Sequence, residues 1–373
     1  MKKLFIIAGE ASGDLHGANL VKSLKKQDNA LKIQGWGGER MQAEGTEILK
    51  HYRELAFMGF AEVIANLNTI RKNFELCKKQ ISAFKPDAVV LIDYPGFNLR
   101  MAKWIKEQGI KVIYYISPQV WAWKKSRVKT IKKYVDKMMV ILPFEKEFYK
   151  KYDYPVEFVG HPLLDETEAM QSAFDNEAFL KENNLPLDKK IIALLPGSRT
   201  QEVSKMLPIM LEVADKFSAY HFVIAQAPSL SDDYLLSYTQ NHPNVSIIKN
   251  KTYPLLNEAY AALVTSGTAT LETALFNVPQ VVCYKGNYIS YLIAKNLVDI
   301  QYISLVNLIL DKELVKELIQ NEMNVKSVTE ELQKILQPES QEKMLTGYRE
   351  LVKKLGEKGA SERAAKIILN EIN

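Results

Sequence analysis

The stretch 3-KLFIIAGEASGD-14 decides the fold. Its first six residues are almost all apolar, as in a strand that is buried on both faces, and the glycines that follow lead directly into an amphipathic helical stretch. The apolar run is shorter than the core of a signal peptide, and the acid Glu10 follows at once, so we expect a buried first strand. A buried strand that turns into a helix is typical of the start of a parallel α/β sheet.

The same alternation of short apolar runs and helical stretches continues outward along the chain. It predicts parallel sheets with right-handed crossovers. The alternation restarts after the polar stretch 165–190, which places a domain boundary near residues 165–175. We expect strands at 3–8, 33–35, 88–92, 111–116, 137–141 and 156–159 in the first half, and at 191–195, 221–224, 245–248, 261–264 and 280–283 in the second.

The composition indicates a folded protein of two ordinary domains. The chain has 373 residues, of which 47% are apolar and 25% charged, and such a length exceeds one ordinary core. No apolar run reaches the roughly 18 residues of a membrane span. The net charge of +5 is mild, so an anionic membrane or a phosphorylated substrate accounts for it and no nucleic acid is expected. Cys77 and Cys283 are expected to be inert thiols of a cytoplasmic protein, and no Cys/His spacing is typical of a metal site.

The first group of candidate catalytic residues is acidic. Glu10 and Asp14 lie in the loop after the first strand, ahead of a helix whose N-terminus can attract a ligand. The glycine spacing is not the dinucleotide fingerprint, and two carboxylates suit sugar hydroxyls better than phosphate. Asp93 opens 93-DYPGFN-98 directly after a predicted strand, where parallel strands line a ligand crevice. Each motif alone is equally compatible with an ordinary turn. His16 could be a base, but its place in the first helical turn favours a structural residue.

The second group lies in the second half and suits a nucleotide. In 195-LPGSR-199, Arg199 stands beside a glycine turn and could clamp a diphosphate. In 265-TSGTATLE-272, hydroxyls and a glycine open a helix where an anion is favoured, and Glu272 could grip two ribose hydroxyls. A surface arginine and an ordinary helix cap are the alternatives. The presence of both motifs in one half favours nucleotide binding.

Two further segments could contact sugar or lipid. The loop 117-SPQVWAW-123 holds two indoles, which suit a sugar platform, an interdomain contact or a hinge plug. Residues 57–74 carry an apolar stripe at helical spacing, which is ordinarily core but becomes a lipid-docking helix if the substrate carries acyl chains. The basic run at 124–137 would add roughly 1 kcal/mol per charge near an anionic surface, or form a solvated helix face. The lipid-facing candidates are Met58, Gly59, Phe60, Ile64 and Leu67.

Taken in order, these motifs resemble those of lipid-A-disaccharide synthase, a GT-B type glycosyltransferase family (family 19), over nearly the whole chain. Three departures concern the donor pocket: Val306 stands where the family usually has Pro, Lys285 where it has Arg, and Asn321 where an acid is frequent. The resemblance also rests on 37-GGERM-41, Met58-Gly59, Glu62-Val63, 142-LPFE-145, 160-GHP-162, 304-SLVN-307 and 317-ELIQ-320.

The resemblance implies an α/β fold of GT-B type, with two doubly wound parallel-sheet domains facing across a cleft. It places an acceptor- and membrane-facing domain at 1–168, a UDP-sugar-binding domain at 169–339, and a C-terminal tail, 340–373, that packs back on the first domain. It implies a hexosyltransferase of lipid A biosynthesis and bacterial outer-membrane biogenesis. We expect it in the cytoplasm, peripherally associated with the inner membrane, without a cofactor, and compatible with a homodimer.

The implied reaction joins UDP-2,3-diacylglucosamine to 2,3-diacylglucosamine 1-phosphate (lipid X), giving lipid A disaccharide 1-phosphate and UDP. An α bond in the donor and a β bond in the product make one inverting displacement the economical route. Asp93 is the first candidate for the base and Glu10 the second, with Asp14 orienting one of them. No Asp-x-Asp pair stands out, so we expect no metal. The donor-binding candidates are Ser198, Arg199, Ser266, Gly267, Thr268, Glu272, Asn307 and Gln320.

Two classes of alternative remain at this level. Another GT-B enzyme, such as the one that adds GlcNAc to the peptidoglycan lipid precursor, or a UDP-GlcNAc 2-epimerase, would share the architecture and the nucleotide half. The acidic loop, the Asp93 motif and the apolar segment of the first half distinguish this chain from them. A non-catalytic lipid- or nucleotide-binding module is the alternative of a different class.

Overall fold

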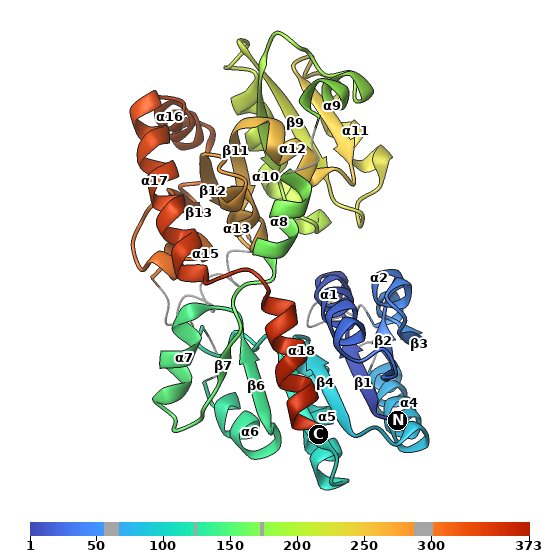
Figure 1. The fold of residues 1–373 in the computed structure, drawn as a ribbon. Coiled ribbons are helices and arrows are strands. Elements are labelled where there is room, and N and C mark those ends of the chain that lie inside the picture. The colour runs from blue at the N-terminus through green and yellow to red at the C-terminus, as the bar shows by residue number, and fades with distance from the viewer. Residues whose placement is uncertain (56–66, 123–124, 172–174, 287–300) are drawn as a thin grey trace. The chain divides into compact units, whose positions relative to one another are not determined.

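The structure is a computed structural model that describes residues 1–55, 67–122, 125–171, 175–286 and 301–373 (Figure 1). The chain separates into two compact units. Unit 1 comprises Met1–Pro162 with Gly356–Asn373, and unit 2 comprises Leu163–Leu355. No helix in the described part of the chain is both long and apolar enough to cross a membrane.

Unit 1 is built on a seven-stranded parallel sheet of order β3-β2-β1-β4-β5-β6-β7. The order reverses at β1 and β4, which pair directly, with Ala8 opposite Ile92. This is the topological switch point at which open α/β sheets bind ligands. The strands are β1 (Lys3–Ala8), β2 (Lys32–Gly37), β3 (Glu47–His51), β4 (Ala88–Ile92), β5 (Lys111–Tyr115), β6 (Lys137–Val140) and β7 (Glu157–Phe158).

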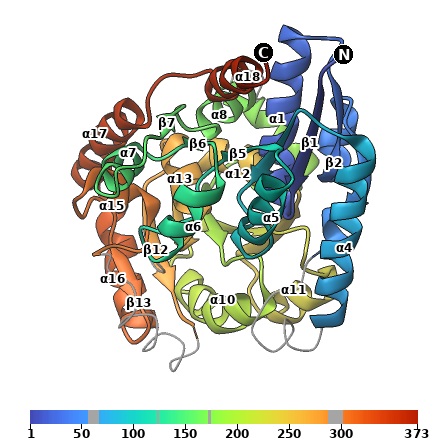
Figure 2. The same cartoon turned by 90° about the horizontal axis from the view of Figure 1, so that it is seen from below.

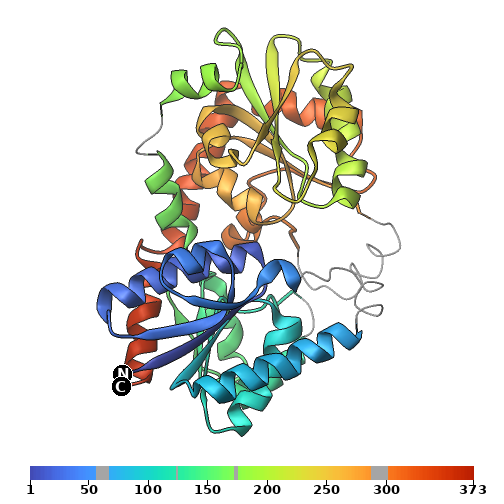
Figure 3. The ribbon, with the colours of Figure 1, turned by 90° about the vertical axis from the view of Figure 1, so that its right-hand side faces the viewer.

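Helices cover both faces of this sheet, so its central strands β1, β4, β5 and β6 are buried on both sides. Phe5 and Ile7 of β1 share a core with Cys77 and Ile81 of α4, while α18 packs against α1 (Figures 1 and 2). α1 and α4 lie on opposite sides of the sheet (Figure 3). The helices are α1 (Ala11–Gln27), α2 (Glu39–Ala43), the 3-10 helix η1 (Tyr52–Glu54), α4 (Leu67–Phe84), α5 (Pro95–Glu107), α6 (Arg127–Tyr134), α7 (Pro143–Lys150) and α18 (Ala360–Glu371).

Unit 2 is built on a six-stranded parallel sheet of order β10-β9-β8-β11-β12-β13. Alternate residues of its central strands form one core, for example Ile191, Ala193 and Leu195 of β8 with Val264 of β11. The strands are β8 (Lys190–Leu195), β9 (Tyr220–Gln226), β10 (Val245–Lys249), β11 (Ala259–Thr265), β12 (Gln280–Tyr284) and β13 (Glu317–Ile319).

Three helices of unit 2, α9, α15 and α16, begin at residues whose side chains cap them. Asn324 caps α16 by accepting the Ser327 N–H at 3.0 Å, and Asp175 caps α9 by accepting the Ala178 N–H at 3.1 Å. The helices are α8 (Leu163–Gln171), α9 (Asn176–Glu182), α10 (Thr200–Ala214), α11 (Asp232–Thr239), α12 (Thr252–Glu258), α13 (Thr268–Leu275), α15 (Leu305–Leu310), α16 (Val325–Ile335) and α17 (Pro338–Leu355).

The prediction of two doubly wound parallel-sheet domains is confirmed. The unit boundaries differ from the expected ones, because residues 340–355 stay with unit 2 and only the chain from Gly356 onward joins unit 1. α17 is held in unit 2 by the fully buried Tyr348, whose hydroxyl donates to the Val278 carbonyl at 3.1 Å. The edge strands β3 and β13 were not predicted, because each is short and neither forms a near-continuous apolar run.

Candidate active site

The acidic candidates of unit 1 come together at the switch point of its sheet. Glu10 follows β1 and Asp93 follows β4, and these strands are paired neighbours. The two carboxylates interact, because the charge of Glu10 raises the pKa of Asp93. Parallel strands end at the same edge of a sheet, so the loops after β1 and β4 form one wall of a site in unit 1.

Asp93 is held in a strained backbone conformation. Asp93 and Tyr94 are consecutive non-glycine residues in the left-handed region, with φ of 41° and 47°. The Asp93 carbonyl accepts hydrogen bonds from the Asn98 amide at 2.8 Å and from the Tyr114 hydroxyl. Strain of this kind persists only where the surroundings fix it, and it concentrates at functional sites. Asn98 and Tyr114 provide that fixation.

The environment of Asp93 keeps its carboxyl close to the midpoint of titration at neutral pH. Burial raises its pKa from 3.8 to about 7, the charge of Glu10 adds to the rise, and the hydrogen bond from the Tyr94 backbone opposes it. A carboxyl with such a pKa is well matched to take a proton at neutral pH. Desolvation by burial is the largest cause of the raised pKa of Asp93.

Glycine is required at position 9 because the ring of Tyr94 lies directly over it. A Cβ on Gly9 would stand 2.3 Å from Tyr94 Cδ1. The close approach brings the loop after β1 against the loop after β4. Glu10, the next residue, occupies the N-cap position of α1, makes no side-chain capping bond and is exposed to solvent. Its carboxylate is therefore available to a ligand.

Asp14 has a structural role at this edge. Its side chain is 2% exposed and accepts three backbone N–H groups, from Gly38 at 2.6 Å and from Arg40 and Met41 at 3.2 Å each. These bonds fix the start of α2 against α1. We expected Asp14 to orient another carboxylate, but its hydrogen-bond partners in the described part of the chain are these backbone groups.

The half-buried His16 lies in α1, two residues after Asp14, and the buried His161 is close enough for their charges to interact. Burial lowers the pKa of His16 to about 4. Burial, with a smaller contribution from the charge of His16, lowers the pKa of His161 to about 3. Both rings are therefore neutral at physiological pH, which fits the structural interpretation of His16 and not that of a base poised near neutrality.

The nucleotide candidates of unit 2 also meet at one sheet edge. β8 and β11 are paired neighbours, so the turn after β8, with Arg199, and the loop after β11, with Ser266, end side by side. Gly197 and Gly267 have φ of 112° and 149°, values that favour glycine. Each turn feeds a helix, α10 or α13, whose free N–H groups face this edge.

Arg199 is the cation of this edge. Its side chain is 60% exposed and pairs with Glu202 at 2.8 Å, one turn into α10. Surface ion pairs of this kind contribute about 0–1 kcal/mol, so a diphosphate can displace Glu202 at little cost. Ser198 is exposed, and its carbonyl accepts the Ser229 hydroxyl at 2.6 Å. That bond holds the turn in place.

The loop after β11 presents the start of α13. The Ser266 hydroxyl donates to the Ile303 carbonyl at 2.9 Å, so it fixes the loop and keeps its acceptor capacity for a ligand. Gly267 is the N-cap and Thr268 the first helical residue, and both are exposed. Glu272, farther along α13, accepts a hydrogen bond from the Tyr253 hydroxyl at 3.3 Å. Burial raises the pKa of Glu272 to about 7, and the Tyr253 bond opposes the rise.

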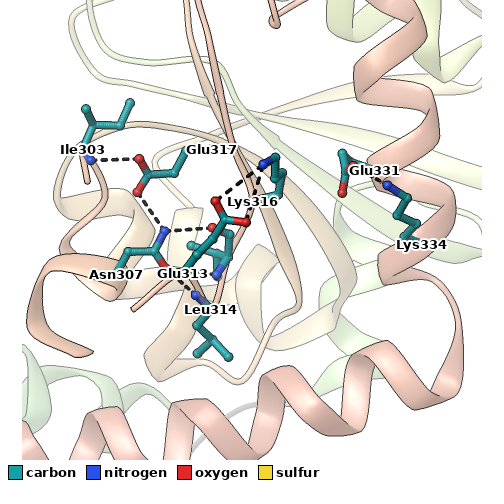
Figure 4. Close-up of polar contacts among 9 residues, drawn as sticks. Ile303, Asn307, Glu313, Leu314, Lys316, Glu317, Glu331 and Lys334 are labelled. Atoms are coloured by element: carbon teal, nitrogen blue, oxygen red, sulfur yellow. Dashed lines mark hydrogen bonds and ion pairs between the residues drawn. The ribbon is translucent and has the colours of Figure 1, made fainter. Parts of the chain in front are cut away.

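Asn307 and Gln320, predicted together as donor-side residues, have different environments. Asn307 is fully buried at the start of α15, and its amide bonds the Glu317 carboxylate at 2.9 Å and backbone groups of Leu314 and Val315 at 2.8–3.0 Å (Figure 4). Every polar atom of that amide has a protein partner. Asn307 therefore has a structural role: its hydrogen bonds connect α15 to β13 and to the residues just before that strand.

Gln320 follows β13 at the same sheet edge as Arg199. Its φ is 54°, its side chain is 6% exposed, and its Nε2 has no hydrogen-bond partner in the described structure. A buried amide donor without a partner loses the stabilisation of a hydrogen bond, and a ligand can restore it. Gln320 therefore keeps the ligand-binding capacity that Asn307 lacks.

Several predicted residues fall outside the described structure. Met58, Gly59, Phe60 and Ile64 lie there, as do Trp123 and the side chain of Leu67, which begins α4. Trp121 is described: it is 7% exposed and packs edge-on against Phe144 at 4.9 Å between ring centroids. Within the described ranges, no group of three or more His, Cys, Asp or Glu side chains could hold a metal ion.

Sequence reasoning missed the residues that support the site. Asn98 and Tyr114 hold Asp93, and Tyr253 holds Glu272. The buried Glu145 lies next to the loop that carries Trp121. Of these residues, only Asn98 and Glu145 belong to motifs that the sequence singles out, 93-DYPGFN-98 and 142-LPFE-145. The spacing within those motifs does not indicate which group each side chain contacts.

A family model described as lipid-A-disaccharide synthetase matches residues 4–371 of the chain. A lipid-A-disaccharide synthase of Syntrophus aciditrophicus is 41% identical, covering 100% of this chain and 98% of that protein. The corresponding protein of Geobacter metallireducens is 40% identical over 99% of this chain and 97% of its own length. A lipid-A-disaccharide synthase of Coxiella burnetii is 38% identical, covering 100% of this chain and 99% of that protein.

Solved structures resemble the chain in fold. A UDP-GlcNAc 2-epimerase from Neisseria meningitidis, bound to UDP-GlcNAc, has a TM-score of 0.70 at 15% identity and covers 99% of this chain and 100% of its own. The calicheamicin glycosyltransferase CalG4 has a TM-score of 0.61 at 16% identity, with 100% and 98% covered. At such identities these likenesses establish the GT-B architecture alone.

Proposed function

The chain belongs to the lipid-A-disaccharide synthase family, a family of lipid A glycosyltransferases, and we propose that it transfers a diacylglucosaminyl group from UDP-2,3-diacylglucosamine to 2,3-diacylglucosamine 1-phosphate with inversion. The products are the β-1,6-linked disaccharide 1-phosphate and UDP. The observation that carries the proposal is Asp93: a carboxyl with a pKa of about 7, held by strained backbone at the switch point of the sheet.

Asp93 serves as the general base. Its carboxylate takes the proton of the acceptor 6-hydroxyl while that oxygen forms its bond to the donor C1. The bond from C1 to the UDP oxygen breaks in the same step, and UDP leaves with the electron pair. A positioned base contributes about 10²–10⁴ to the rate. Glu10 is the second candidate for this role, and its charge helps to set the pKa of Asp93.

The strand edge of unit 2 binds the donor. Arg199 and the start of α13 at Gly267 and Thr268 stabilise the charge that develops on the diphosphate. Glu272, oriented by Tyr253, accepts the ribose hydroxyls, and Gln320 donates its free amide hydrogens to the nucleotide sugar. UDP-GlcNAc in the epimerase of the same fold is consistent with a nucleotide sugar as ligand.

We place the enzyme at the cytoplasmic face of the inner membrane, peripherally bound and able to act as a homodimer. Both proposed substrates carry acyl chains, and burial of each methylene is worth about 0.8 kcal/mol. The apolar stripe around Met58, Phe60 and Ile64, with Leu67, is the proposed contact with those chains. The basic run that begins at Lys124 adds attraction to anionic lipid.

The experiment that tests the function is an assay of the purified protein with the two monosaccharide lipids, with and without a chelator. We expect disaccharide 1-phosphate and UDP in equal amounts, at a rate that the chelator leaves unchanged. Release of 2-epimerised sugar from UDP-GlcNAc, without disaccharide, would assign the chain to the other enzyme of this fold. Binding of UDP without any product would indicate a non-catalytic module.

A further inference from the structure

A second buried carboxyl, Glu145, lies in unit 1 outside the residues assigned to the reaction. It is the third residue of α7, is 1% exposed, and accepts the Leu142 N–H on Oε2 at 3.0 Å. Among the residues that the structure describes, neither its other oxygen, Oε1, nor the buried indole N–H of Trp121 has a hydrogen bond of good geometry. The carboxyl and the indole thus each keep one buried polar atom that the described residues leave unpaired.

The contacts of Glu145 lead into one loop, residues 117–122, which we call the Trp121 loop. The Trp121 indole and the Ser117 hydroxyl both lower the pKa of Glu145, so both lie within reach of its carboxyl. Ser117 also shares a 2.7 Å hydrogen bond with the Tyr149 hydroxyl. Phe144 packs edge-on against Trp121. Three residues of α7 thus hold both ends of the loop.

Capping of α7 alone does not account for a carboxyl at this depth. Asp175, the N-cap of α9, also accepts a backbone N–H with its carboxylate at a helix start, but from an exposed position. Burial costs a carboxylate heavily, and here it raises the pKa of Glu145 to about 8, so the group is mostly neutral at pH 7. A neutral carboxylic acid keeps an acceptor oxygen that can face the Trp121 N–H, and it adds one O–H donor.

The Trp121 loop adjoins the reaction residues. It follows β5, whose neighbour β4 ends at Asp93. Tyr114 of β5 donates its hydroxyl to the Asp93 carbonyl, and Ile116, which precedes the loop, is in the left-handed region with φ of 65°. The loop is thus anchored on one side to the strand that holds Asp93 and on the other to α7.

We propose that Glu145 is a positioning residue: it locks the Trp121 loop as the part of unit 1 that orients the acceptor sugar beside Asp93. This proposal rests on the proposed function, because it names the acceptor as the occupant. Glu145 acts through Trp121 and Ser117 and touches no substrate itself. Aromatic rings suit this task because their apolar face stacks on a sugar ring while their N–H makes a polar contact.

The test compares two variants of Glu145 with a cap variant elsewhere. Glu145→Gln keeps an acceptor and a donor in a neutral group of the same shape, and Glu145→Leu removes both. Asp175→Ala removes a helix cap of the same kind in unit 2. For each purified protein we would measure the melting temperature, the KM of each substrate, kcat, and the Trp121 emission, isolated by subtracting the spectrum of Trp121→Phe.

We expect Glu145→Gln to keep wild-type kinetics within about threefold, and Glu145→Leu to raise the acceptor KM roughly tenfold, as expected for an unsatisfied buried group, with a red-shifted Trp121 emission. The donor KM should stay within about twofold in both. Asp175→Ala should lower the melting temperature alone.

Three outcomes would overturn the proposal. Unchanged kinetics and emission in Glu145→Leu, with lower stability only, would leave Glu145 as a helix cap. Loss of turnover in Glu145→Gln would show that the ionisable carboxyl itself takes part in chemistry. If wild-type protein makes no disaccharide, the proposed function fails, and an unchanged Trp121 emission in Glu145→Leu would then refute the locking role independently.

Discussion

The sheet edge of unit 1 and the sheet edge of unit 2 each carry candidate residues, and they differ in the groups that they present. The edge of unit 1 holds acids, among them the half-buried Asp93 and the exposed Glu10, and its backbone is strained at Asp93 and Tyr94. The edge of unit 2 holds glycine turns, exposed helix starts and the exposed Arg199. Burial raises a carboxyl pKa and suits proton transfer, whereas exposed N–H groups and a mobile cation suit a diphosphate that arrives and departs.

The difference teaches where rigidity is needed. A general base must be held within hydrogen-bond reach of one proton, so Asp93 is fixed by Asn98 and Tyr114. Arg199 is tied only to Glu202 by an ion pair that solvent reaches, so it can exchange partners. If the comparison is correct, substitutions at the two edges should change different kinetic constants.

The largest effect is expected for Asp93→Asn. The amide has the same shape but cannot take a proton, so kcat should fall by about 10³ while the Kd of UDP changes by less than about twofold. Asp87→Asn is the matched control, because Asp87 stands at the other end of β4, exposed, where it accepts the Lys3 N–H at 2.7 Å. Retention of turnover in Asp93→Asn would remove it as the base and leave Glu10.

The pH dependence of the same variant has a defined sign. The pKa of Asp93 is raised from 3.8 to about 7 in the folded state, so folding favours its protonated form. The stability from this group is fully present below pH 3.8 and is lost as the pH rises through about 7. Wild-type kcat/KM should rise over that same range as the base ionises. Asp93→Asn should therefore melt higher than wild type at pH 8, although it is inactive.

Arg199→Ala should have the next largest effect, on the donor. Loss of the cation should lower kcat/KM for the UDP-sugar about 10²-fold and weaken UDP binding measured by calorimetry. The acceptor KM should not change, because the acceptor contacts are assigned to unit 1. Lys181→Ala is the control, since Lys181 is another exposed cation of unit 2 that pairs with a helix acid, Glu177. If kcat/KM for the UDP-sugar fell equally in both variants, Arg199 would act only through the net positive charge of unit 2 and not through a specific contact with the diphosphate.

The fold was accessible from the sequence because parallel strands that are buried on both faces leave a nearly continuous apolar signature. The runs at β1, β4 and β8 show it. The signature fails at β3 and β13, which are short edge strands with charged residues. The position of Asp93 and Arg199 at strand ends was also predictable, since a motif that follows such a run must lie at the carboxyl edge.

The roles of the site residues were less accessible, because they depend on partners distant in sequence. Asp14 and Glu10 look equivalent in 9-GEASGD-14. However, the Asp14 carboxylate accepts three backbone N–H groups of residues 38–41, whereas the Glu10 side chain makes no capping bond to α1. The pKa of Asp93 depends on burial and on Glu10, a group 83 positions earlier. Spacing contains neither fact.

The smallest effect on turnover, and the sharpest test of the unit 2 edge, comes from Asn307→Ala set beside Gln320→Ala. Asn307 has bonds to Glu317, Leu314 and Val315, so its loss should cost about 2–4 kcal/mol of unfolding free energy and leave the KM of the UDP-sugar within about twofold at a temperature where the variant is folded. The Nε2 of Gln320 has no partner among the described residues, so the loss of this side chain should raise that KM roughly tenfold with little change in stability. Denaturant unfolding and steady-state kinetics measure both. A raised KM in folded Asn307→Ala would contradict the purely structural role, because it would show that the bonds of Asn307 to β13 and the residues before it also hold Gln320, which follows β13, in place for the donor.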